Sequence, residues 1–551
     1  MRIGSSNTKS CTYREKRSSL GLTTLIFFAL VYGLILLHPV RSWASLRVDL
    51  SKTFPYIPFQ DSGYYLGQIE GFRSGMRGFG NPFYFEHSND GFGNGSSALF
   101  AFWGLVGRIL NFDILQTYLF MTFATGTLTA IFVGMYFRTI YGKNFLGVLI
   151  PIAIVFIVCG TELGRPSPTQ LGLWVVFLLL WLQMQVTHDS KGRRKKANFY
   201  VLVLIFLTFS NPFYALFVGI CHFLLLIRMD YREELRKTAR QLFLLFISFV
   251  PFGFTYLKKF EHEESQAERF GVIHSHLPGA YKLTFLLAVT ICAVYFFARN
   301  KDKSCRVVMV LLISNLITLN SQVFTGVHYE MEPHLQLLTL ISLLSASCYL
   351  IVIRPKSLIT YALTLSLVIS SNNSTNLATL FSKPVVRSTQ TELKILNSVA
   401  KEAKIGDVLF YQDSKFPSES QEMIGVLTST NLYFSPAGNL SRAADKEILE
   451  RMACGFYVNQ SGLNEGLNQA YVNRFENEKL MFSKWDTLLN RFELDVYDPN
   501  LEASRRTADL EFVLKYQKSN CSDLFNFKYK LDFLVNKDSE LVKLHENETN
   551  P

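Results

Sequence analysis

The sequence predicts a polytopic α-helical membrane protein with a C-terminal α/β domain outside the cytoplasm. Three observations predict this fold class. Hydrophobic residues make up 49% of the 551 residues, with 48 phenylalanines, which is too apolar for a soluble protein of this length. The apolar residues form runs of the length that crosses a bilayer. Lysine and arginine gather in short clusters between these runs, as they do in the loops of membrane proteins.

About eleven transmembrane helices are expected. The run Phe199–Ile227 is too long for one crossing, and Pro212 interrupts it because proline cannot donate a helical hydrogen bond, so we expect two helices there. Ser97–Leu110 is apolar but short and contains Arg108, which fits a helix along the membrane interface. The other nine expected crossings are Leu20–Leu37, Leu115–Phe137, Phe145–Val158, Leu171–Val186, Leu242–Tyr256, Thr284–Phe297, Val307–Leu319, Leu335–Ile353 and Leu358–Ile369.

The distribution of lysine and arginine predicts which ends of the helices face the cytoplasm. With the N-terminus in the cytoplasm, the short cytoplasmic loops hold about 23 lysines and arginines, against about five in the short external loops. The same clusters account for the net charge of +11, and since they form no basic face, we expect no nucleic-acid partner. We expect an integral, multi-pass protein, in a bacterial inner membrane rather than the endoplasmic reticulum.

Two domains follow from this orientation. Residues 1–383 form the transmembrane domain, with a large first external loop at 38–114. An odd number of crossings then places residues 384–551 outside the cytoplasm. There the apolar runs shorten to the length of strands and amphipathic stretches appear, which predicts a soluble α/β domain.

The first external loop carries the first candidate site residues. Asp61 precedes Tyr64 and Tyr65 in a stretch rich in glycine, which makes a backbone adaptable. An acid there can deprotonate a hydroxyl or hold a divalent cation, unless it is only a solvated carboxylate. Further along the loop, Glu86 and His87 fit either an acid–base pair or packing within the loop.

Later external loops add further candidates. Glu162 and Arg165 fit either a shared aqueous cavity, where arginine would contact a phosphate, or a surface ion pair. Glu268 lies in a charge-dense loop, which is usually just solvated. His328 and His334 flank the start of a helix, where they would bind an anionic headgroup or cap the helix.

Four tracts together resemble the membrane glycosyltransferases of the GT-C type. They are DSGYYL at 61–66, NPFYFEH at 81–87, TELGRPSP at 161–168 and NSQVFTGVHYEMEPH at 320–334. The resemblance implies transfer of a sugar from a polyprenyl-phosphate donor to an extracytoplasmic acceptor, a glycan, lipid or protein, with inversion. It implies that Asp61 is the base or a metal ligand, that Glu162 is the second acid, and that Arg165 and His334 contact the phosphate.

The sequence also departs from related enzymes. Oligosaccharyltransferases carry a WWDYG motif, of which only Trp485–Asp486 occurs here, while SQAE at 265–268 resembles their external-loop motif in an earlier loop than theirs. Block transfer to asparagine is therefore not expected, and a need for magnesium or manganese at Asp61 and Glu162 stays open. The alternative is a non-enzymatic transporter or assembly factor for envelope polysaccharide, which would place its ionisable residues inside the helices.

Overall fold

The computed structural model describes about half of the chain. Within that part there are thirteen α-helices, one 3-10 helix and six strands. The described residues are 19–37, 62–75, 82–87, 97–141, 165–188, 193–227, 243, 246–247, 249–250, 273–274, 276, 281–297, 303–328, 331–353, 390–411, 418–433, 447, 450–451, 532–536 and 538–543.

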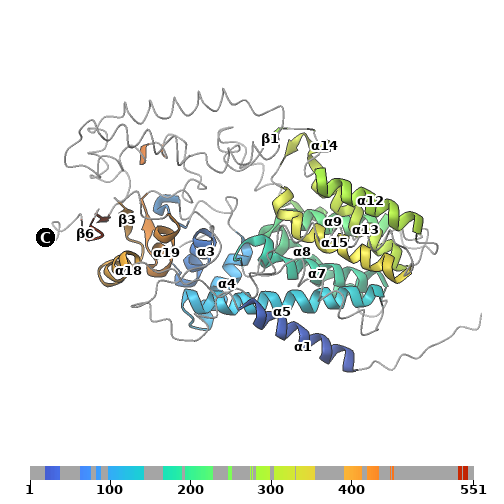
Figure 1. The fold of residues 1–551 in the computed structure, drawn as a ribbon, viewed down its shortest axis with the longest axis horizontal. Coiled ribbons are helices and arrows are strands. Elements are labelled where there is room, and N and C mark those ends of the chain that lie inside the picture. Colours follow the sequence, from blue (N-terminus) through green and yellow to red (C-terminus); the bar gives the residue numbers. More distant parts are fainter. Residues whose placement is uncertain are drawn as a thin grey trace, which may run out of the picture.

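Eight long helices form a bundle (Figure 1). Each overlaps a segment that its apolar sequence predicted to be a helix, and α8 and α9 separate at the predicted break. Of the other three expected crossings, Phe145–Val158 and Leu358–Ile369 lie outside the described residues, as does most of Leu242–Tyr256. The eight helices are α1 (Ser19–Leu36), α5 (Ile114–Tyr141), α7 (Pro168–His188), α8 (Arg193–Ser210), α9 (Pro212–Ile227), α12 (Tyr281–Phe297), α13 (Lys303–Leu319) and α15 (Met331–Ile353).

Two of the described helices, α5 and α7, are long and apolar enough to cross a membrane on length and composition alone. They run in the same direction, because Phe132 of α5 stacks on Trp174 of α7 with ring centroids 6.2 Å apart. One step further along both helices, Tyr136 lies 6.0 Å from Phe177. The ends of α5 and α7 therefore lie at the same end of the bundle.

Basic residues gather at that end of the bundle, which we call the basic end. Arg138 lies in the last turn of α5, and α8 begins with Arg193–Lys196 just after α7 ends. Ser304, at the start of α13, donates a hydrogen bond from Oγ to the carbonyl of Ile140 at the end of α5 (2.7 Å). The end of α5 and the starts of α8 and α13 therefore lie at one end of the bundle, and each of these segments contains basic residues in its sequence, in α13 Lys303 and Arg306.

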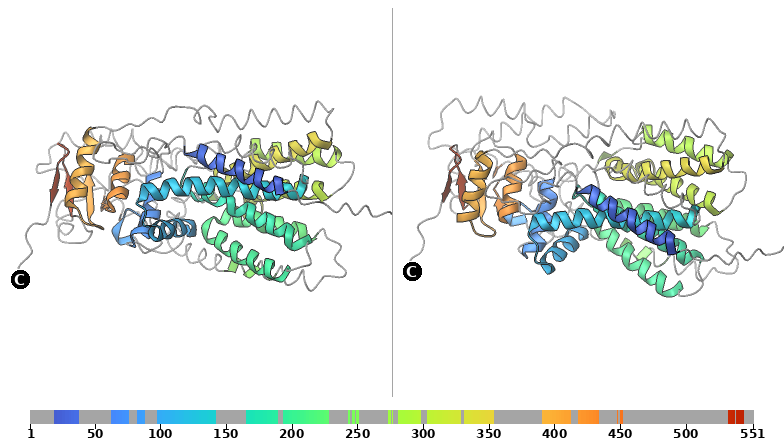
Figure 2. Two further views of the ribbon diagram at one scale, coloured as in Figure 1. Left: turned by 90° about the horizontal axis from the view of Figure 1, so that it is seen from below. Right: turned by 60° about the horizontal axis from the view of Figure 1, so that its bottom comes forward.

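The opposite end of the bundle carries two shorter helices and the C-terminal region. In Figures 1 and 2, α3 (Ser62–Ser74) and α4 (Ala98–Ile109) lie between the bundle and α18 (Gln390–Glu402) with its neighbouring strands. One hydrophobic core continues from the bundle helices through α3 and α4 into the C-terminal region. The described parts of both predicted domains thus share buried side chains.

The C-terminal region contains a four-stranded sheet in the order β4-β3-β5-β6. Its central strand, β3 (Val408–Tyr411), is parallel to β4 (Asn431–Leu432) and to β5 (Phe533–Val535). The edge strand β6 (Leu541–Lys543) is antiparallel to β5. Helix α19 (Ser418–Thr428) connects β3 to β4 and packs on α3.

Part of the segment predicted to be the first external loop differs from its expectation. Its glycine-rich stretch was expected to be an adaptable loop, but Ser62–Ser74 forms helix α3. The glycines there allow close packing: a side chain at Gly63 would lie 2.8 Å from Cβ of Glu422, and one at Gly67 would lie 2.9 Å from Cβ of Pro82. Glycine therefore serves the approach of neighbouring segments, rather than backbone freedom.

Candidate functional site

The starts of several helices meet at the end of the bundle opposite the basic end. Ser97, just before α4, donates a hydrogen bond from Oγ to the carbonyl of Ser210, the last residue of α8 (2.8 Å). A side chain at Gly172, in the first turns of α7, would lie 3.5 Å from both Leu99 of α4 and Tyr214 of α9. The starts of α4, α7 and α9 are therefore direct neighbours.

Helices α15 and α3 begin at the same place. His334 of α15 stacks on Phe213 of α9 with ring centroids 4.6 Å apart, and its Nδ1 lies 3.1 Å from Oγ1 of Thr169 in α7. Tyr65 of α3 lies 5.8 Å from Phe100 of α4, ring centroid to ring centroid. We call the meeting point of the starts of α3, α4, α7, α9 and α15 the helix-start junction.

The local sequence explains why helices begin here. Ser97 accepts a hydrogen bond from the backbone N–H of Leu99 (3.2 Å), and Asn211 accepts one through Oδ1 from the N–H of Tyr214 (3.1 Å). Both are side-chain caps of helix N-termini. Proline follows the capping position in α7 and α9, and proline is favoured there because that N–H needs no helical partner.

The junction has the electrostatics of an anion site. The N-terminus of a helix carries a partial positive charge and N–H groups that point outward, so it attracts phosphates and carboxylates. Asn211 adds a donor: its side chain is buried, with the residue 1% exposed, and its Nδ2 has no hydrogen-bond partner in the described part of the chain. A buried donor without a partner is costly, so a ligand that accepts from it would be favoured.

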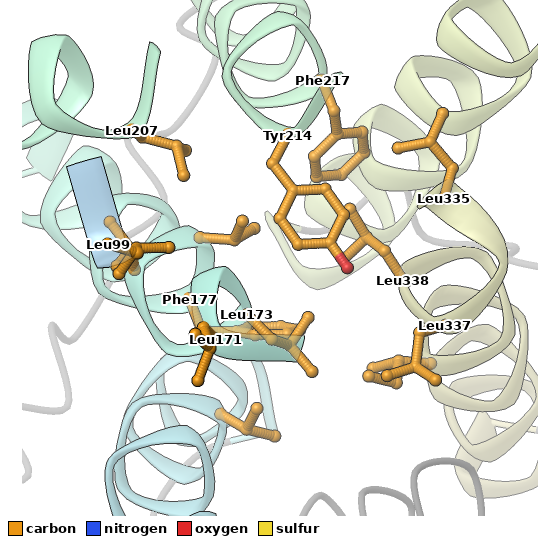
Figure 3. Close-up of a cluster of buried hydrophobic side chains, with 14 of the residues drawn as sticks. Leu99, Leu171, Leu173, Phe177, Leu207, Tyr214, Phe217, Leu335, Leu337 and Leu338 are labelled. Atoms are coloured by element: carbon orange, nitrogen blue, oxygen red, sulfur yellow. The ribbon is translucent and has the colours of Figure 1, made fainter. Parts of the chain in front are cut away.

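An apolar layer lies beneath the junction. Figure 3 shows Tyr214 of α9 between Leu171 and Leu173 of α7 on one side and Leu335 and Leu338 of α15 on the other. All five side chains are buried. The polar starts of these helices thus lie directly over a hydrophobic interior.

The structure places some of the predicted site residues at the junction. Tyr65 and His334 belong to it by the contacts above, and Arg165 lies just before α7, half-buried. His334 contacts its neighbouring helices and does not merely cap its own. Asp61 is the residue immediately before α3, and Glu162 lies in the stretch just before Arg165, but both are outside the described residues.

Other predicted residues lie elsewhere. Tyr64 is buried and packs against Phe83, with ring centroids 6.4 Å apart. Burial raises the pKa of its phenol far above the ordinary value, although a hydrogen bond with Gln68 acts to lower it. Its hydroxyl therefore stays protonated. His328 lies in β2 (Val327–His328), which pairs with β1 (Ile273–His274). Glu268 lies outside the described residues.

Glu86 and His87 are each bound to the C-terminal region. Arg451 donates from Nη2 to Oε2 of Glu86 (2.7 Å) and from Nε to Oε1 of Glu447 (2.9 Å). His87 Nε2 lies 3.0 Å from both oxygens of Glu447, and the guanidinium lies 4.6 Å from the ring centre of Tyr84. We call these residues the Arg451 cluster. Both side chains thus contact the C-terminal region, which neither of the two interpretations left open by the sequence had included.

A second connection to the C-terminal region runs through Glu70. This residue is 2% exposed and accepts hydrogen bonds from Nε and Nη2 of Arg73 at 2.5 and 2.7 Å. Ser429 donates to it from Oγ (2.6 Å). The hydrogen bond and the charge of Glu70 raise the pKa of Arg73, against the lowering effect of burial, so the guanidinium stays charged.

Sequence reasoning missed several of these residues. The spacing of Glu70 and Arg73 on one helix face was a usable signal for an ion pair, and Ser210-Asn211-Pro212 was a usable signal for a helix cap. No sequence signal marks Arg451, which lies 365 positions from its partner Glu86. The same holds for Ser429, which lies 359 positions from Glu70.

The metal expectation stays open. Among the described residues, no group of three or more histidine, cysteine, aspartate or glutamate side chains could hold a metal ion, but the two predicted ligands lie outside those residues. Comparison with models of known protein families finds no match, and comparison with curated proteins finds no significant similarity. The chemistry of the junction is therefore the basis for assigning a function.

Proposed function

We propose that this protein is a membrane glycosyltransferase that transfers a sugar from a polyprenyl-phosphate donor to an acceptor outside the cytoplasm. The helix-start junction carries this proposal. It gathers the N-termini of five helices at the end of the bundle away from the basic end, and Asp61 immediately precedes one of these helices, α3, in the sequence. Helix N-termini attract anions, and phosphate is among the anions that they bind.

The two ends of the bundle support the membrane orientation. Lysine and arginine stay on the cytoplasmic side of membrane proteins, so the basic end faces the cytoplasm and the junction faces outward. Large apolar side chains are exposed on the bundle helices, among them Phe27 of α1 (60%), Phe285 (68%) and Phe296 (75%) of α12. Such exposure suits lipid contact and is unfavourable in water.

Different parts of the donor would bind to the polar junction and to the apolar layer beneath it. Its phosphate would bind at the junction, near Asn211 and His334, with Arg165 as a charged contact. Its prenyl chain would lie along the apolar helices beneath. The sugar would then face the external side, where the acceptor arrives.

Asp61 would serve as the base. It accepts the proton of the acceptor hydroxyl, whose oxygen attacks the anomeric carbon of the sugar, and the bond to the phosphate oxygen breaks with its electron pair leaving on the prenyl phosphate. One displacement inverts the configuration at that carbon. Glu162 is the second acid, and a magnesium or manganese ion held by both carboxylates would stabilise charge on the leaving phosphate.

Sugar transfer with purified protein and a panel of polyprenyl-phosphate sugars tests this proposal. We expect the wild type to release prenyl phosphate and Asp61→Asn to lose roughly a hundredfold or more in rate, the usual contribution of a general base. Asp113→Asn is the matched control in the same loop, because Asp113 caps Gln116 through Oδ1 (2.7 Å) and asparagine can replace that acceptor. Glu162→Gln tests the second acid. No release with any donor, or full activity of Asp61→Asn, would contradict the assignment.

A transporter for envelope polysaccharide is the second candidate, favoured by one observation. His222 of α9 is 3% exposed and lies inside the bundle, stacked on Tyr200 of α8 with ring centroids 5.0 Å apart. An ionisable residue inside a membrane bundle is a feature of carriers. His222→Phe should leave sugar transfer unchanged if the protein is the enzyme. It should abolish flux in a liposome transport assay if the protein is the carrier.

A further inference from the structure

We propose that Glu70 is a positioning residue of the reaction. Through Ser429 it couples α3 to the C-terminal region, and this coupling holds the start of α3, which Asp61 immediately precedes in the sequence, at the helix-start junction. The inference rests on the proposed function for its catalytic consequence. The coupling itself can be tested without turnover.

The contacts of Glu70 fix α3 on two sides. Its carboxylate holds Arg73, whose Nη1 donates to the carbonyl of Phe112 between α4 and α5 (3.0 Å). On the other side it accepts from Ser429. Glu70 thus lies between the bundle side and the C-terminal side of α3, and its buried hydrogen bonds are costly to break.

The backbone of Ser429 adopts a conformation that glycine usually occupies, which suggests that the serine side chain has a role there. It follows α19 with a φ of 55°, and the next N–H, of Thr430, bonds to the carbonyl of Gly425 (2.9 Å). This is the helix ending in which glycine is usually found, because other residues are strained at positive φ. The hydroxyl bound to Glu70 is what serine supplies there and glycine would not.

The coupling bears on the start of α3. Glu422 of α19 packs against Gly63 in the first turn, and Ser429 holds the helix two turns later. The C-terminal region thus contacts α3 near both ends. A small displacement of a catalytic group lowers the rate more than it lowers binding.

Hydrogen exchange of the α3 amides tests the coupling, with two variants in the full-length protein. Ser429→Gly removes the hydroxyl but suits the positive φ, so the fold should be kept. Ser420→Ala is the matched control, because Ser420 also donates from Oγ to a buried glutamate at 2.6 Å, but to Glu392 within the C-terminal region. We expect the α3 amides to exchange roughly tenfold faster in Ser429→Gly only. Equal exchange in α3 of the two variants would overturn the coupling.

Kinetics test the catalytic consequence. We expect Ser429→Gly and Glu70→Gln to lower kcat roughly tenfold with KM for the donor unchanged, because the phosphate contacts stay intact. Ser420→Ala should keep both constants. An unchanged kcat in Ser429→Gly would overturn the positioning role. Absence of turnover in the wild type would instead refute the proposed function, and the exchange measurement would still decide whether Ser429 holds α3.

Discussion

The helix-start junction and the Arg451 cluster are both polar and largely buried, but they satisfy their polar groups differently. In the Arg451 cluster the guanidinium, 1% exposed, contacts two carboxylates directly. In the junction the positive charge is the partial charge of helix termini, and Asn211 keeps a donor without a partner in the described residues. One site is complete within the protein, whereas the other has capacity for an anion.

This difference separates stability from function. A buried charge network is costly to break, because the remaining charges lose their partners. An unsatisfied donor beside helix N-termini costs stability and is retained where a ligand uses it. Changes in the Arg451 cluster should therefore alter unfolding, and changes in the junction should alter donor binding.

The largest expected effect is on unfolding. Arg451→Met should lower the free energy of unfolding by about 3 kcal/mol, the lower end of the range for a broken buried pair, because Glu86 keeps some solvent contact. Thermal unfolding in detergent measures this. The control is Lys394→Met, since Lys394 lies 4.0 Å from Glu540 with side chains 52% and 63% exposed, and such a pair contributes less than about 0.5 kcal/mol. Equal losses of unfolding free energy in the two variants would contradict a special contribution of the Arg451 cluster to stability.

His334→Phe should act on the donor. Phenylalanine keeps the stack on Phe213 but removes the ring nitrogens, so we expect KM for the donor to rise roughly tenfold, the effect of one hydrogen bond to a charged group. The free energy of unfolding should fall by only about 1 kcal/mol, the usual net contribution of one hydrogen bond, because Thr169 loses its contact with Nδ1. Steady-state kinetics with varied donor check this, and an unchanged KM would exclude His334 from the phosphate contact.

Asn211→Ser also tests donor binding at the junction, with a smaller expected rise in KM. Serine can still cap α9 but lacks the side-chain N–H donor, so we expect KM for the donor to rise by roughly threefold to tenfold. Asn211→Ala, which also loses the cap, should in addition lower stability by about 1 kcal/mol. If the serine variant bound donor normally while the alanine variant did not, Asn211 would be a cap only.

The pH dependence of unfolding is the smallest effect. Burial raises the pKa of Glu447, but the hydrogen bond with His87 and the charges of Arg451 and His87 outweigh it, so the pKa lies below its ordinary value of 4.5. A lowered folded-state pKa contributes stability that is complete above pH 4.5 and is lost as the pH falls through the folded pKa. Glu86, Tyr84 and Tyr433 also face this network. Glu447→Gln should flatten the loss below that pH, and an identical profile would contradict the pairing.

The helices were predictable because their signal is local. Apolar runs predicted eight helices of the bundle, and Pro212 predicted the break between α8 and α9. Helix α3 was missed because its apolar content is low and its glycines favour a loop reading. It is a helix because α4 and α19 pack against it, and that tertiary support outweighs the low helix propensity of glycine.

The candidate site was predictable in part. His334 and Tyr65 were named from loop positions, and both belong to the junction. The partners of Glu86 and His87 could not be found, since no local pattern connects these two residues to residues about 360 positions away. Convergence of helix starts is likewise a property of packing directions, which the sequence of one helix does not encode.

Binding of polyprenyl phosphate without a sugar tests the junction most directly. Native mass spectrometry of the purified protein should show a retained prenyl phosphate on the wild type and on Arg451→Met, if that variant remains folded. Occupancy should fall on Asn211→Ser and fall further on His334→Phe. Equal occupancy of wild type and both junction variants would contradict the assignment of the helix-start junction as the donor site.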